Sequence, residues 1–410
     1  MKNKLNTIDL FAGCGGLMDG FQQEGHYETL ACVEWEKAPC NTLINRLRTR
    51  WHHDNADEEV IRFDIQRTEE LFSGFEDDEY GNHEGLDKLI GKKKIDVIIG
   101  GPPCQAYSLA GRIRDEHGMR DDYRNYLFES YIRVVNHFCP KYFIFENVIG
   151  MLSAMPDGTP IVNKIKTAFD EAGYYVINDF SEALFDVADF GIPQHRRRVI
   201  ILGVRKDSFE DDSYKSFVEH FYRVELPKNR TTYKTVQEAI GDLPKIYPAK
   251  EVIKLDGRKY SHTPTSFSTV QNHEPRYHCD RDIKTFNMLA DDIQSGRNQF
   301  TDTDSLKRLY TTLTGKESNI HKYYVLRSNE PSNTIPAHLN KDGLRHIHPD
   351  PKQARSITVR EAARLQAFDD DFVFLGPQML QYKMVGNAVP PQFARIVADS
   401  LYKTIRYYDK

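Results

Sequence analysis

The sequence lacks the segments that direct a chain into or across a membrane. It has no run of about 18 uncharged apolar residues, so we expect no membrane-spanning helix. Residues Met1 to Asp9 contain no apolar signal region and lead directly into a predicted strand, which argues against secretion. There is no internal repeat and no low-complexity segment. We therefore expect a globular protein of the cytoplasm.

Cysteine is scarce, and positive charge is not in excess. The six cysteines form no Cys-x-x-Cys pair of the kind that binds a metal, so we expect no metal site and a reduced, intracellular set of thiols. With 55 Lys and Arg against 60 Asp and Glu, the net charge of -5 argues against a nucleic-acid-binding protein. Between Arg205 and Glu330, however, basic residues outnumber acidic ones, and association depends on local potential more than on the total.

A chain of 410 residues suggests about two to three domains. Its first half alternates short, nearly continuous apolar runs with helix-length amphipathic segments. Such runs are typical of strands buried on both faces of a parallel sheet, so the alternation predicts a doubly wound, mostly parallel α/β domain. The predicted strands are 5–10, 29–33, 95–99, 142–145 and 198–203, and the clearest helices are 126–138 and 161–172. Residues 69–94 are acidic, and we expect a solvated insertion there.

The pattern changes after residue 205. Residues 206–325 have few periodic runs, and we predict a smaller, loop-rich domain. Periodicity returns after Arg327, where Thr358 and Glu361 form a capping-box signature that opens a helix over 359–367. An amphipathic helix follows over 388–403. The expected division is 1–205, 206–325, 326–384 and a final segment, 385–410, that packs with the first domain.

A glycine-rich turn joins the first predicted strand to a helix between Asp9 and Gly16. Glycines there let the backbone turn sharply and approach a ligand at the helix N-terminus. A dinucleotide fingerprint would need a glycine where the chain has Met18. The turn therefore predicts a nucleotide-type site without the spacing that binds a pyrophosphate. The alternative interpretation is a tight turn that binds nothing.

Glu34 follows the second predicted strand, and Asp64, in Arg62-Phe-Asp-Ile65, would close a further short strand. Glu34 could accept hydrogen bonds from ribose hydroxyls, and Trp35 beside it could stack on an adenine. Asp64 could bond an exocyclic amine. The alternative is that these acids are unrelated surface charges.

Two further strands end in residues that can carry out chemistry. Cys104 follows the strand 95–99 after a rigid Gly-Gly-Pro-Pro segment, and Glu146 follows the strand 142–145. In open α/β sheets these strand ends face the ligand crevice. We interpret Cys104 as a presented thiol, although a lone cysteine is more often a small buried apolar residue. Glu146 would be partly desolvated, which suits a proton donor; the alternative is a structural acid bonded to backbone amides.

Three consecutive arginines precede the last strand of this region. In an extended segment Arg196 and Arg198 project to one face and Arg197 to the other. Two guanidinium groups near a thiol and a carboxylate would lower the pKa of the thiol and bind an anion or a carbonyl oxygen. A solvated basic patch is the alternative.

Together these residues resemble the DNA cytosine-5 methyltransferases of the bacterial modification type. The resemblance covers most of the chain and rests on seven motifs in the family's order. They are Asp9-Leu-Phe-Ala-Gly-Cys-Gly-Gly16, Glu34-Trp35, Gly101-Pro-Pro-Cys-Gln105, Glu146-Asn-Val148, Gln194-His-Arg-Arg-Arg198, Arg360-Glu-Ala-Ala-Arg-Leu-Gln366 and Gly386-Asn-Ala-Val-Pro390. Residues 206–325 correspond to the family's variable target-recognition domain.

The resemblance implies the fold of the S-adenosylmethionine-dependent methyltransferases, with S-adenosyl-L-methionine as methyl donor and no metal. The residues that it assigns to donor binding are Phe11, Gly13, Gly15, Gly16, Glu34, Trp35, Asp64, Ile65, Pro103, Leu127 and Asn387. Those that it assigns to catalysis are Cys104, Glu146, Arg196 and Arg198.

The resemblance also implies a mechanism. The Cys104 thiolate would add to C6 of cytosine and activate C5, while Glu146 would bond at N3. Arg196 and Arg198 would orient the base and its carbonyl oxygen. The cytosine must leave the stacked duplex. The segment Leu109 to Arg124, with Gly111, Gly118 and several charges, suits a lid that closes over that base; the alternative is a passive surface loop. Loss of the C5 proton and elimination of the thiol would release 5-methylcytosine.

The expected partner is a short, specific double-stranded DNA sequence in a bacterial cell, bound by a monomer. The compact architecture favours a modification enzyme paired with a restriction endonuclease. One branch of the family methylates transfer RNA and carries a Cys-Phe-Thr signature, whereas here Cys279 precedes Asp280 and Arg281, which favours DNA. A non-catalytic DNA-binding member is disfavoured by the intact catalytic positions. A dehydrogenase is disfavoured by the missing third glycine.

Overall fold

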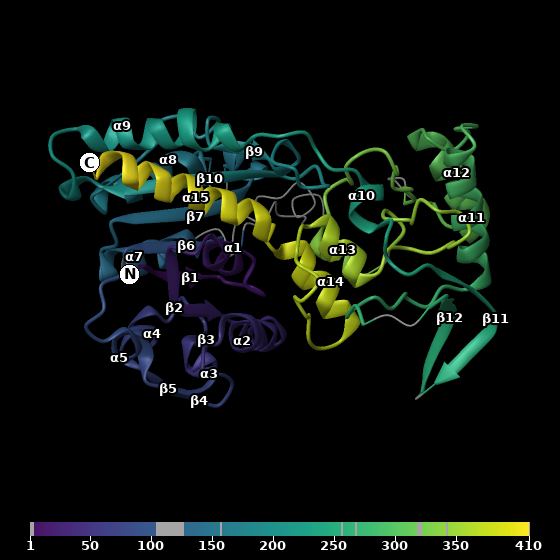
Figure 1. Cartoon of the computed structure of the whole chain (residues 1–410), viewed down its shortest axis with the longest axis horizontal. Coiled ribbons are helices and arrows are strands. Elements are labelled where there is room, and N and C mark those ends of the chain that lie inside the picture. The colour runs from purple at the N-terminus through teal and green to yellow at the C-terminus, as the bar shows by residue number, and fades with distance from the viewer. Residues whose placement is uncertain are drawn as a thin grey trace. The chain divides into compact units, whose positions relative to one another are not determined.

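A computed structural model describes residues 4–103, 127–155, 158–255, 257–266, 269–317, 322–341 and 343–409. The chain divides into two compact units (Figure 1). The first combines residues 1–191, 196–232 and 388–410, and the second combines residues 192–195 and 233–387. No helix within the described ranges is long and apolar enough to cross a membrane.

The first unit is built around a mostly parallel sheet. Its strand order is β3-β2-β1-β6-β7-β10-β8, with β9 paired to β10. Strands β1, β2, β3, β6 and β7 are parallel, and β10 is antiparallel to its neighbours. The strands are β1 (Leu5–Leu10), β2 (Tyr27–Glu34), β3 (Val60–Arg62), β6 (Val97–Gly100), β7 (Tyr142–Val148), β8 (Tyr174–Val176), β9 (Leu184–Asp186) and β10 (Arg197–Arg205). This confirms the predicted α/β class.

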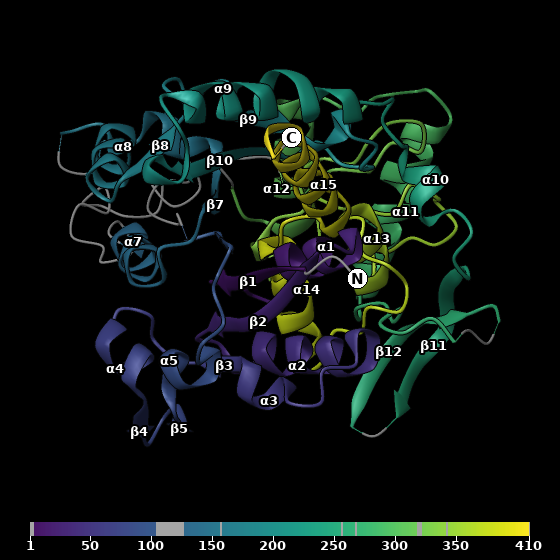
Figure 2. The same cartoon turned by 60° about the vertical axis from the view of Figure 1, so that its left-hand side comes forward.

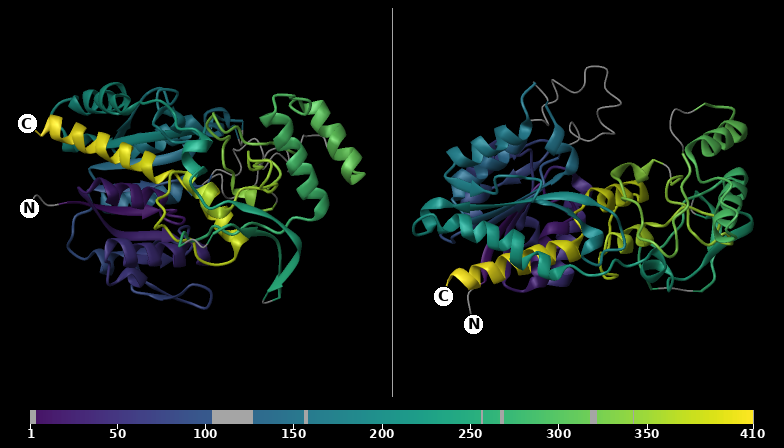
Figure 3. Two further views of the ribbon diagram at one scale, coloured as in Figure 1. Left: turned by 45° about the vertical axis from the view of Figure 1, so that its right-hand side comes forward. Right: turned by 90° about the horizontal axis from the view of Figure 1, so that it is seen from above.

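Helices cover both faces of this sheet. Helices α1 and α15 lie side by side on one face, and α7 and α8 lie on the other (Figures 2 and 3). The helices of the unit are α1 (Gly16–Glu24), α2 (Lys37–Trp51), α3 (Ala56–Glu59), α4 (Thr68–Ser73), α5 (Gly85–Ile90), α7 (Leu127–Phe138), α8 (Ile161–Glu171), α9 (Ser213–His220) and α15 (Pro391–Tyr408). The last helix begins at a proline, whose fixed φ suits the first helical turn.

The packing of α1 against α15 depends on two glycines in α1. A Cβ atom at Gly20 would lie 2.4 Å from the carbonyl oxygen of Pro391 and 2.5 Å from the Cβ of Ala394. A Cβ at Gly16 would lie 2.3 Å from the carbonyl oxygen of Val389. Because real atoms cannot approach so closely, only glycine permits this helix contact. The segment after residue 387 is therefore an integral part of the first unit.

The observed boundary between the units differs from the predicted one. Residues 206–232, expected in the smaller domain, lie in the first unit. The hydroxyl of Tyr222 donates a 2.8 Å hydrogen bond to the carbonyl oxygen of Ile200 and accepts one of 2.7 Å from the amide of Leu202, both on β10. Only a few residues of this segment are apolar and buried, and their pattern is too short to recognise in the sequence.

The acidic insertion over residues 69–94 is more ordered than predicted. It contains α4, α5 and an antiparallel hairpin of β4 (Phe75–Asp77) and β5 (Gly81–His83). Leu71 and Leu86 are fully buried, and the ring of Phe75 stacks on Phe63 with centroids 3.8 Å apart. Isolated apolar residues thus form a small core that the acidic composition obscures.

The second unit has less regular structure. Its elements are α10 (Val236–Ile240), β11 (Ile246–Leu255), β12 (Arg258–Pro264), α11 (Asp280–Gln294), α12 (Thr303–Thr314), α13 (Val359–Leu365) and α14 (Gln378–Asn387). Helices α11 and α12 pack their apolar faces with Val325 and Ile347. The predicted capping box is confirmed, because Thr358 and Glu361 bond each other's backbone amides at the start of α13.

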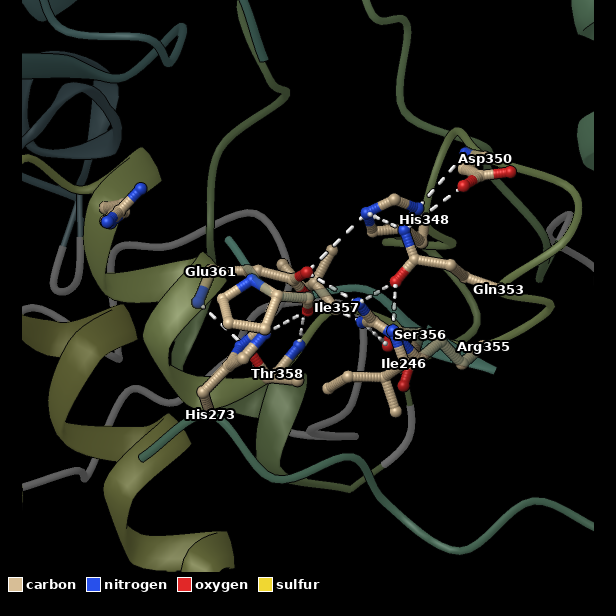
Figure 4. Close-up of polar contacts among 12 residues, drawn as sticks. Ile246, His273, His348, Asp350, Gln353, Arg355, Ser356, Ile357, Thr358 and Glu361 are labelled. Atoms are coloured by element: carbon tan, nitrogen blue, oxygen red, sulfur yellow. Dashed lines mark hydrogen bonds and ion pairs between the residues drawn. The ribbon is translucent and has the colours of Figure 1, made fainter. Parts of the chain in front are cut away.

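A buried ion pair connects several segments of the second unit (Figure 4). Arg355 donates two 2.6 Å hydrogen bonds to Glu361, and both side chains are almost completely buried. Arg355 also donates to the side-chain oxygen of Gln353, which accepts the amide of Ile246 at the start of β11. On β12, the Nε2 atom of His262 bonds the main-chain oxygen of Gln353 at 3.0 Å. The Arg355–Glu361 pair therefore anchors both β11 and β12.

The charges of this cluster follow from burial and from the arginine. Burial alone would raise the pKa of the Glu361 carboxyl, but Arg355 reverses the effect and holds that pKa well below its usual value. Burial lowers the pKa of His348 to about 4 and that of His278 to about 3. At neutral pH the cluster thus contains one charged pair among neutral histidines.

Replacing Gly20 with alanine should destabilise the protein. Alanine favours a helix over glycine by about 1 kcal/mol, but the added methyl group would collide with the α15 backbone, and overpacking costs about 1–3 kcal/mol. Urea unfolding of Gly20→Ala should show a net loss of unfolding free energy. A gain in stability would contradict the close contact between α1 and α15.

Replacing Arg355 with alanine should be far more damaging than removing a comparable surface arginine. Breaking a buried ion pair from one side costs about 3–5 kcal/mol because the remaining charge stays buried. Arg297 is a matched control in the same unit, since it pairs with Asp291 and both side chains are about half exposed, and such surface pairs contribute little to stability. Denaturant unfolding of Arg355→Ala and Arg297→Ala measures the difference, and equal losses would refute the anchoring role.

Candidate active site

The glycine turn at the end of β1 has the backbone of a ligand-binding loop. Phe11, Gly13 and Gly15 all have positive φ, at 56°, 56° and 94°. A Cβ at Gly13 would meet no atom within 4 Å, whereas one at Gly15 would collide with the side chain of Leu43. Gly15 thus lies against the core, and Gly13 borders open space that a ligand can approach.

Glu34 at the end of β2 holds this turn in place. Its carboxylate accepts hydrogen bonds from the amides of Gly13 at 2.9 Å, Trp35 at 2.9 Å and Glu36 at 2.8 Å. Burial raises the pKa of Glu34 to about 6, although these amide bonds favour the ionised form and lower it in part. The carboxylate has lone pairs for further donors, so it can position the turn and accept bonds from a ligand.

Asp9 is a residue that the sequence interpretation did not single out. It is fully buried in β1, and its Oδ2 atom accepts a 3.1 Å bond from the amide of Met18 in α1. Burial raises the pKa of Asp9 well above its usual value, and the amide offsets only part of the shift. Asp9 therefore fixes the strand-to-helix turn from beneath. The sequence signal that could have indicated Asp9 is an acidic residue near the end of the run that predicts the first strand.

The other residues predicted for donor binding near this edge follow β2 and β3. Trp35 has 47 % of its surface exposed, as a side chain must have to stack on an incoming ring. Asp64 is half-buried, and its Oδ1 atom accepts the amide of Gln66 at 3.0 Å. Ile65 is buried beside it. Because β1, β2 and β3 are adjacent and parallel, their carboxyl ends gather these side chains at one edge of the sheet.

The ends of β6 and β7 form a second part of this edge. The Oε1 atom of Glu146 in β7 pairs with the Nε atom of Arg198 in β10 at 2.8 Å, and each side chain has only 12 % of its surface exposed. A Cβ at Gly101 would lie 2.7 Å from the Oε2 atom of Glu146. Glycine at 101 therefore lets the loop after β6 pass directly over the carboxylate.

Cys104 belongs to that loop but lies outside the described residues, as does the predicted lid over 109–124. The description of the loop ends at Pro103, which is half-buried and was predicted to contact the donor. Leu127, the first described residue after the gap, is buried at the start of α7.

Arg196 lies almost fully buried just before β10, whereas Arg197 is exposed. The amide of Arg196 donates to Asp186 at 3.0 Å, and its Nη2 atom donates to the carbonyl oxygen of Ala388 at 3.0 Å. Burial lowers the pKa of Arg196 and of Arg198, and the Glu146 carboxylate acts against this shift in both. The arrangement is two guanidinium groups around one carboxylate in a site with little water.

Two predicted donor-binding residues have other surroundings. Gly16 opens α1, where the carbonyl oxygen of Val389 explains its lack of a side chain. Asn387 is exposed at the end of α14 and belongs to the second unit. The described part of the chain has no group of three or more His, Cys, Asp or Glu residues arranged to hold a metal ion, and its five cysteines are free.

Comparison with known proteins gives a consistent result. A family model described as C-5 cytosine-specific DNA methylase matches residues 5–403. The chain is 33 % identical to the type II methyltransferase M.Bpa9945I of Bacillus paralicheniformis, with 97 % of this chain and 99 % of the relative covered. It is 31 % identical to the type II methyltransferase M1.HphI of Haemophilus parahaemolyticus, with coverage of 97 % and 87 %.

A solved structure supports the same fold. A protein encoded within an E. coli prophage matches with a TM-score of 0.61 at 24 % identity, and the match covers 98 % of this chain and 100 % of that chain. The family model spans nearly the whole sequence, and the relatives match over almost their full lengths. The chain therefore belongs to the C-5 cytosine-specific DNA methylase family and is a DNA (cytosine-5)-methyltransferase.

Proposed function

We propose that this enzyme methylates C5 of cytosine within a short, specific double-stranded DNA sequence, through a covalent bond between Cys104 and C6 of a flipped-out base. The observation that carries the proposal is the Glu146–Arg198 pair beneath Gly101. A carboxylate and a guanidinium group lie there, largely buried, beside the backbone that leads within three residues to Cys104.

S-adenosyl-L-methionine fits the edge formed by β1, β2 and β3. Gly13 borders open space, Glu34 can accept bonds from ribose hydroxyls, and the exposed ring of Trp35 can cover an adenine. Asp64, Ile65, Phe11 and Pro103 would complete the contacts. When bound, this molecule supplies an electrophilic methyl group.

The protein's own groups would then prepare the cytosine. The Cys104 thiolate forms a bond to C6, and the electron pair of the C5–C6 double bond becomes available at C5. Glu146 shares a proton with N3 and so stabilises the charge that builds on the ring, while Arg198 binds the carbonyl oxygen. Arg196, held by its bond to Ala388, would support this arrangement. After C5 has gained the methyl group, it loses its proton to a base, and the thiolate leaves C6.

The chemistry requires the cytosine to leave the base stack, because C6 is not accessible within a duplex. Side chains of the second unit, from residue 233 onward, would recognise the neighbouring bases. The compact chain and the type II relatives favour a role beside a cognate restriction endonuclease. We propose that the enzyme acts as a monomer in the bacterial cytoplasm.

Transfer RNA is a weaker candidate substrate. The recognition region has Cys279 followed by Asp280 and Arg281, and Cys279 precedes the first turn of α11. The residues that follow Cys279 thus begin an ordinary helix and do not form the signature of the RNA-methylating branch.

Expression in a host that lacks cytosine methylation, followed by conversion sequencing, should reveal 5-methylcytosine in one short sequence motif. Cys104→Ser should abolish the signal because an alcohol adds to C6 far less readily than a thiolate. Cys139→Ser is the matched control: this cysteine is exposed, and its replacement should preserve methylation. Unmodified DNA from well-folded wild-type protein would contradict the proposal and direct the search to RNA.

Donor affinity should fall as the pH is lowered through about 6, the pKa of Glu34 in the free protein. The raised pKa means that Glu34 is ionised above this pH and protonated below it, and protonation removes an acceptor for the ribose hydroxyls. Loss of a hydrogen bond to a charged group costs roughly 1.5–3 kcal/mol, or about tenfold or more in affinity.

Titration calorimetry with S-adenosyl-L-methionine across this pH range measures the effect. Glu34→Gln should bind weakly at every pH and lose the step near pH 6. Glu36→Gln should keep a step, moved to lower pH, because the negative charge of Glu36 helps to raise the pKa of Glu34. A step of the same size in Glu34→Gln would show that another group is responsible.

A further inference from the structure

The β11–β12 hairpin is a separate two-stranded ribbon in the second unit. Its strands pair only with each other among the described strands, and Figures 1 and 2 show the ribbon extending away from the helices of its own unit. Residues 250–255 and 257–259 are exposed, whereas residues 246–249 and 260–262 are buried or half-buried. Among the described residues of this unit, the outer part of the ribbon therefore has no packing partner beyond its own two strands.

Positive charges face one another across this ribbon. Lys254 in β11 lies directly opposite Lys259 in β12, so the two side chains project from the same face. Lys250 and Arg258 are close by in the same strands. In the described part of the chain, none of these four cations forms an ion pair or a side-chain hydrogen bond. Directly opposed like charges destabilise a hairpin, so this arrangement lowers the stability of the isolated protein.

Apolar side chains accompany the cations. Val252, Ile253 and Leu255 have 44 %, 40 % and 59 % of their surface exposed. The register shifts between Pro248 and Ile253, so β11 carries extra residues relative to β12, and Val252 lies within this bulge. Residues 250–259 contain four basic and two acidic residues, so a partner that covers the ribbon should be anionic and should also offer apolar contacts.

The base of the ribbon is fixed, in contrast to its exposed outer part. The Arg355–Glu361 pair holds Gln353, which bonds Ile246 of β11 and His262 of β12. Ser261 adds to this, because its hydroxyl bonds His262 at 2.9 Å and accepts the amide of His278 at 2.9 Å. A rigid base lets an exposed ribbon present its charges in a defined orientation, so less ordering entropy is lost when a partner binds.

We infer that the outer part of this hairpin binds duplex DNA, with the aliphatic face formed by Ile253 and Leu255 toward base edges and with Lys254 and Lys259, on the opposite face, reaching the flanking phosphates. The inference rests on the proposed function and assigns DNA contact to particular residues of this chain. A two-stranded ribbon fits the major groove of B-form DNA, where thymine methyl groups offer apolar contact. The phosphates would give the two opposed lysines the anionic partners that they do not have among the described residues of the free protein.

The test is DNA binding by the full-length Lys254→Ala/Lys259→Ala variant, measured as fluorescence anisotropy over a range of salt concentrations without the methyl donor. The plot of log K against log salt has a negative slope, and each lost phosphate contact makes it less steep by about 0.9. The slope of the double variant should therefore be less steep than that of the wild type by about 1.8. The loss should be equal for a duplex that contains the methylated motif and for an unrelated duplex. Lys92→Ala/Lys93→Ala removes the same charge from an exposed segment of the first unit and should leave the slope unchanged.

Thermal melting separates lost binding from lost folding. Because the opposed lysines repel each other, Lys254→Ala/Lys259→Ala should melt at the same temperature as the wild type or higher. Lys259→Glu should melt higher still, since its carboxylate would face Lys254, yet it should bind DNA more weakly than Lys259→Ala. A melting temperature that rises while the affinity for DNA falls is the result expected if this surface binds an anionic partner.

The outcomes distinguish this inference from the proposed function. If the wild type methylates DNA and the double variant binds DNA with unchanged affinity and slope, the inference is wrong and the function stands. If the salt dependence of DNA binding is weaker in the double variant than in the wild type, but neither protein transfers a methyl group, DNA binding by the ribbon is supported. The proposed methyltransferase function on this DNA is then contradicted. Weaker binding with a lowered melting temperature would also overturn the inference, because it would indicate a structural role.

Discussion

The parallel alignment of β3, β2, β1, β6 and β7 is the constraint on which the candidate site depends. Parallel strands end at the same edge of a sheet, so residues from distant parts of the sequence meet there without any dedicated scaffold. Glu34 and Glu146 are separated by more than a hundred residues, yet both lie at or near the carboxyl ends of such strands. Strand β10 runs in the opposite direction, and for that reason its first residues, not its last, bring Arg198 to the same edge.

Two carboxylates at this edge have different surroundings, which suit the different roles proposed for them. Glu34 is bonded by backbone amides, so its position is set by the turn that it stabilises. Glu146 is bonded by a guanidinium group and lies against a glycine, so its charge is balanced and its approach to the loop above is close. Both are largely shielded from water, a condition that strengthens every hydrogen bond to a ligand.

Much of the fold and of the site could be predicted from the sequence, because both depend on local patterns. Continuous apolar runs identified the strands, and polar residues at the ends of those runs gave Glu34 and Glu146 as candidate site residues. The features that were missed depend on contacts between distant residues. Nothing in the sequence near Gly16 indicates that the backbone of residue 389 will pass beside it, or that Gly101 will adjoin a carboxylate. The boundary after residue 232 was missed because a few aromatic side chains, such as Tyr222, determine which unit a short segment joins.

The position of α15 has a consequence for biosynthesis. A ribosome makes residues 233–387 before it makes α15, yet α15 belongs to the first unit, whose other elements precede residue 233. Until α15 emerges, α1 has no partner for its glycine face, and the hydroxyl of Tyr27 has no acceptor at Ala398. The second unit can therefore fold during synthesis, while the first is completed only after α15 has been made. A chain released early would contain the glycine turn and the Glu146 site but would lack the helix that closes the fold around them.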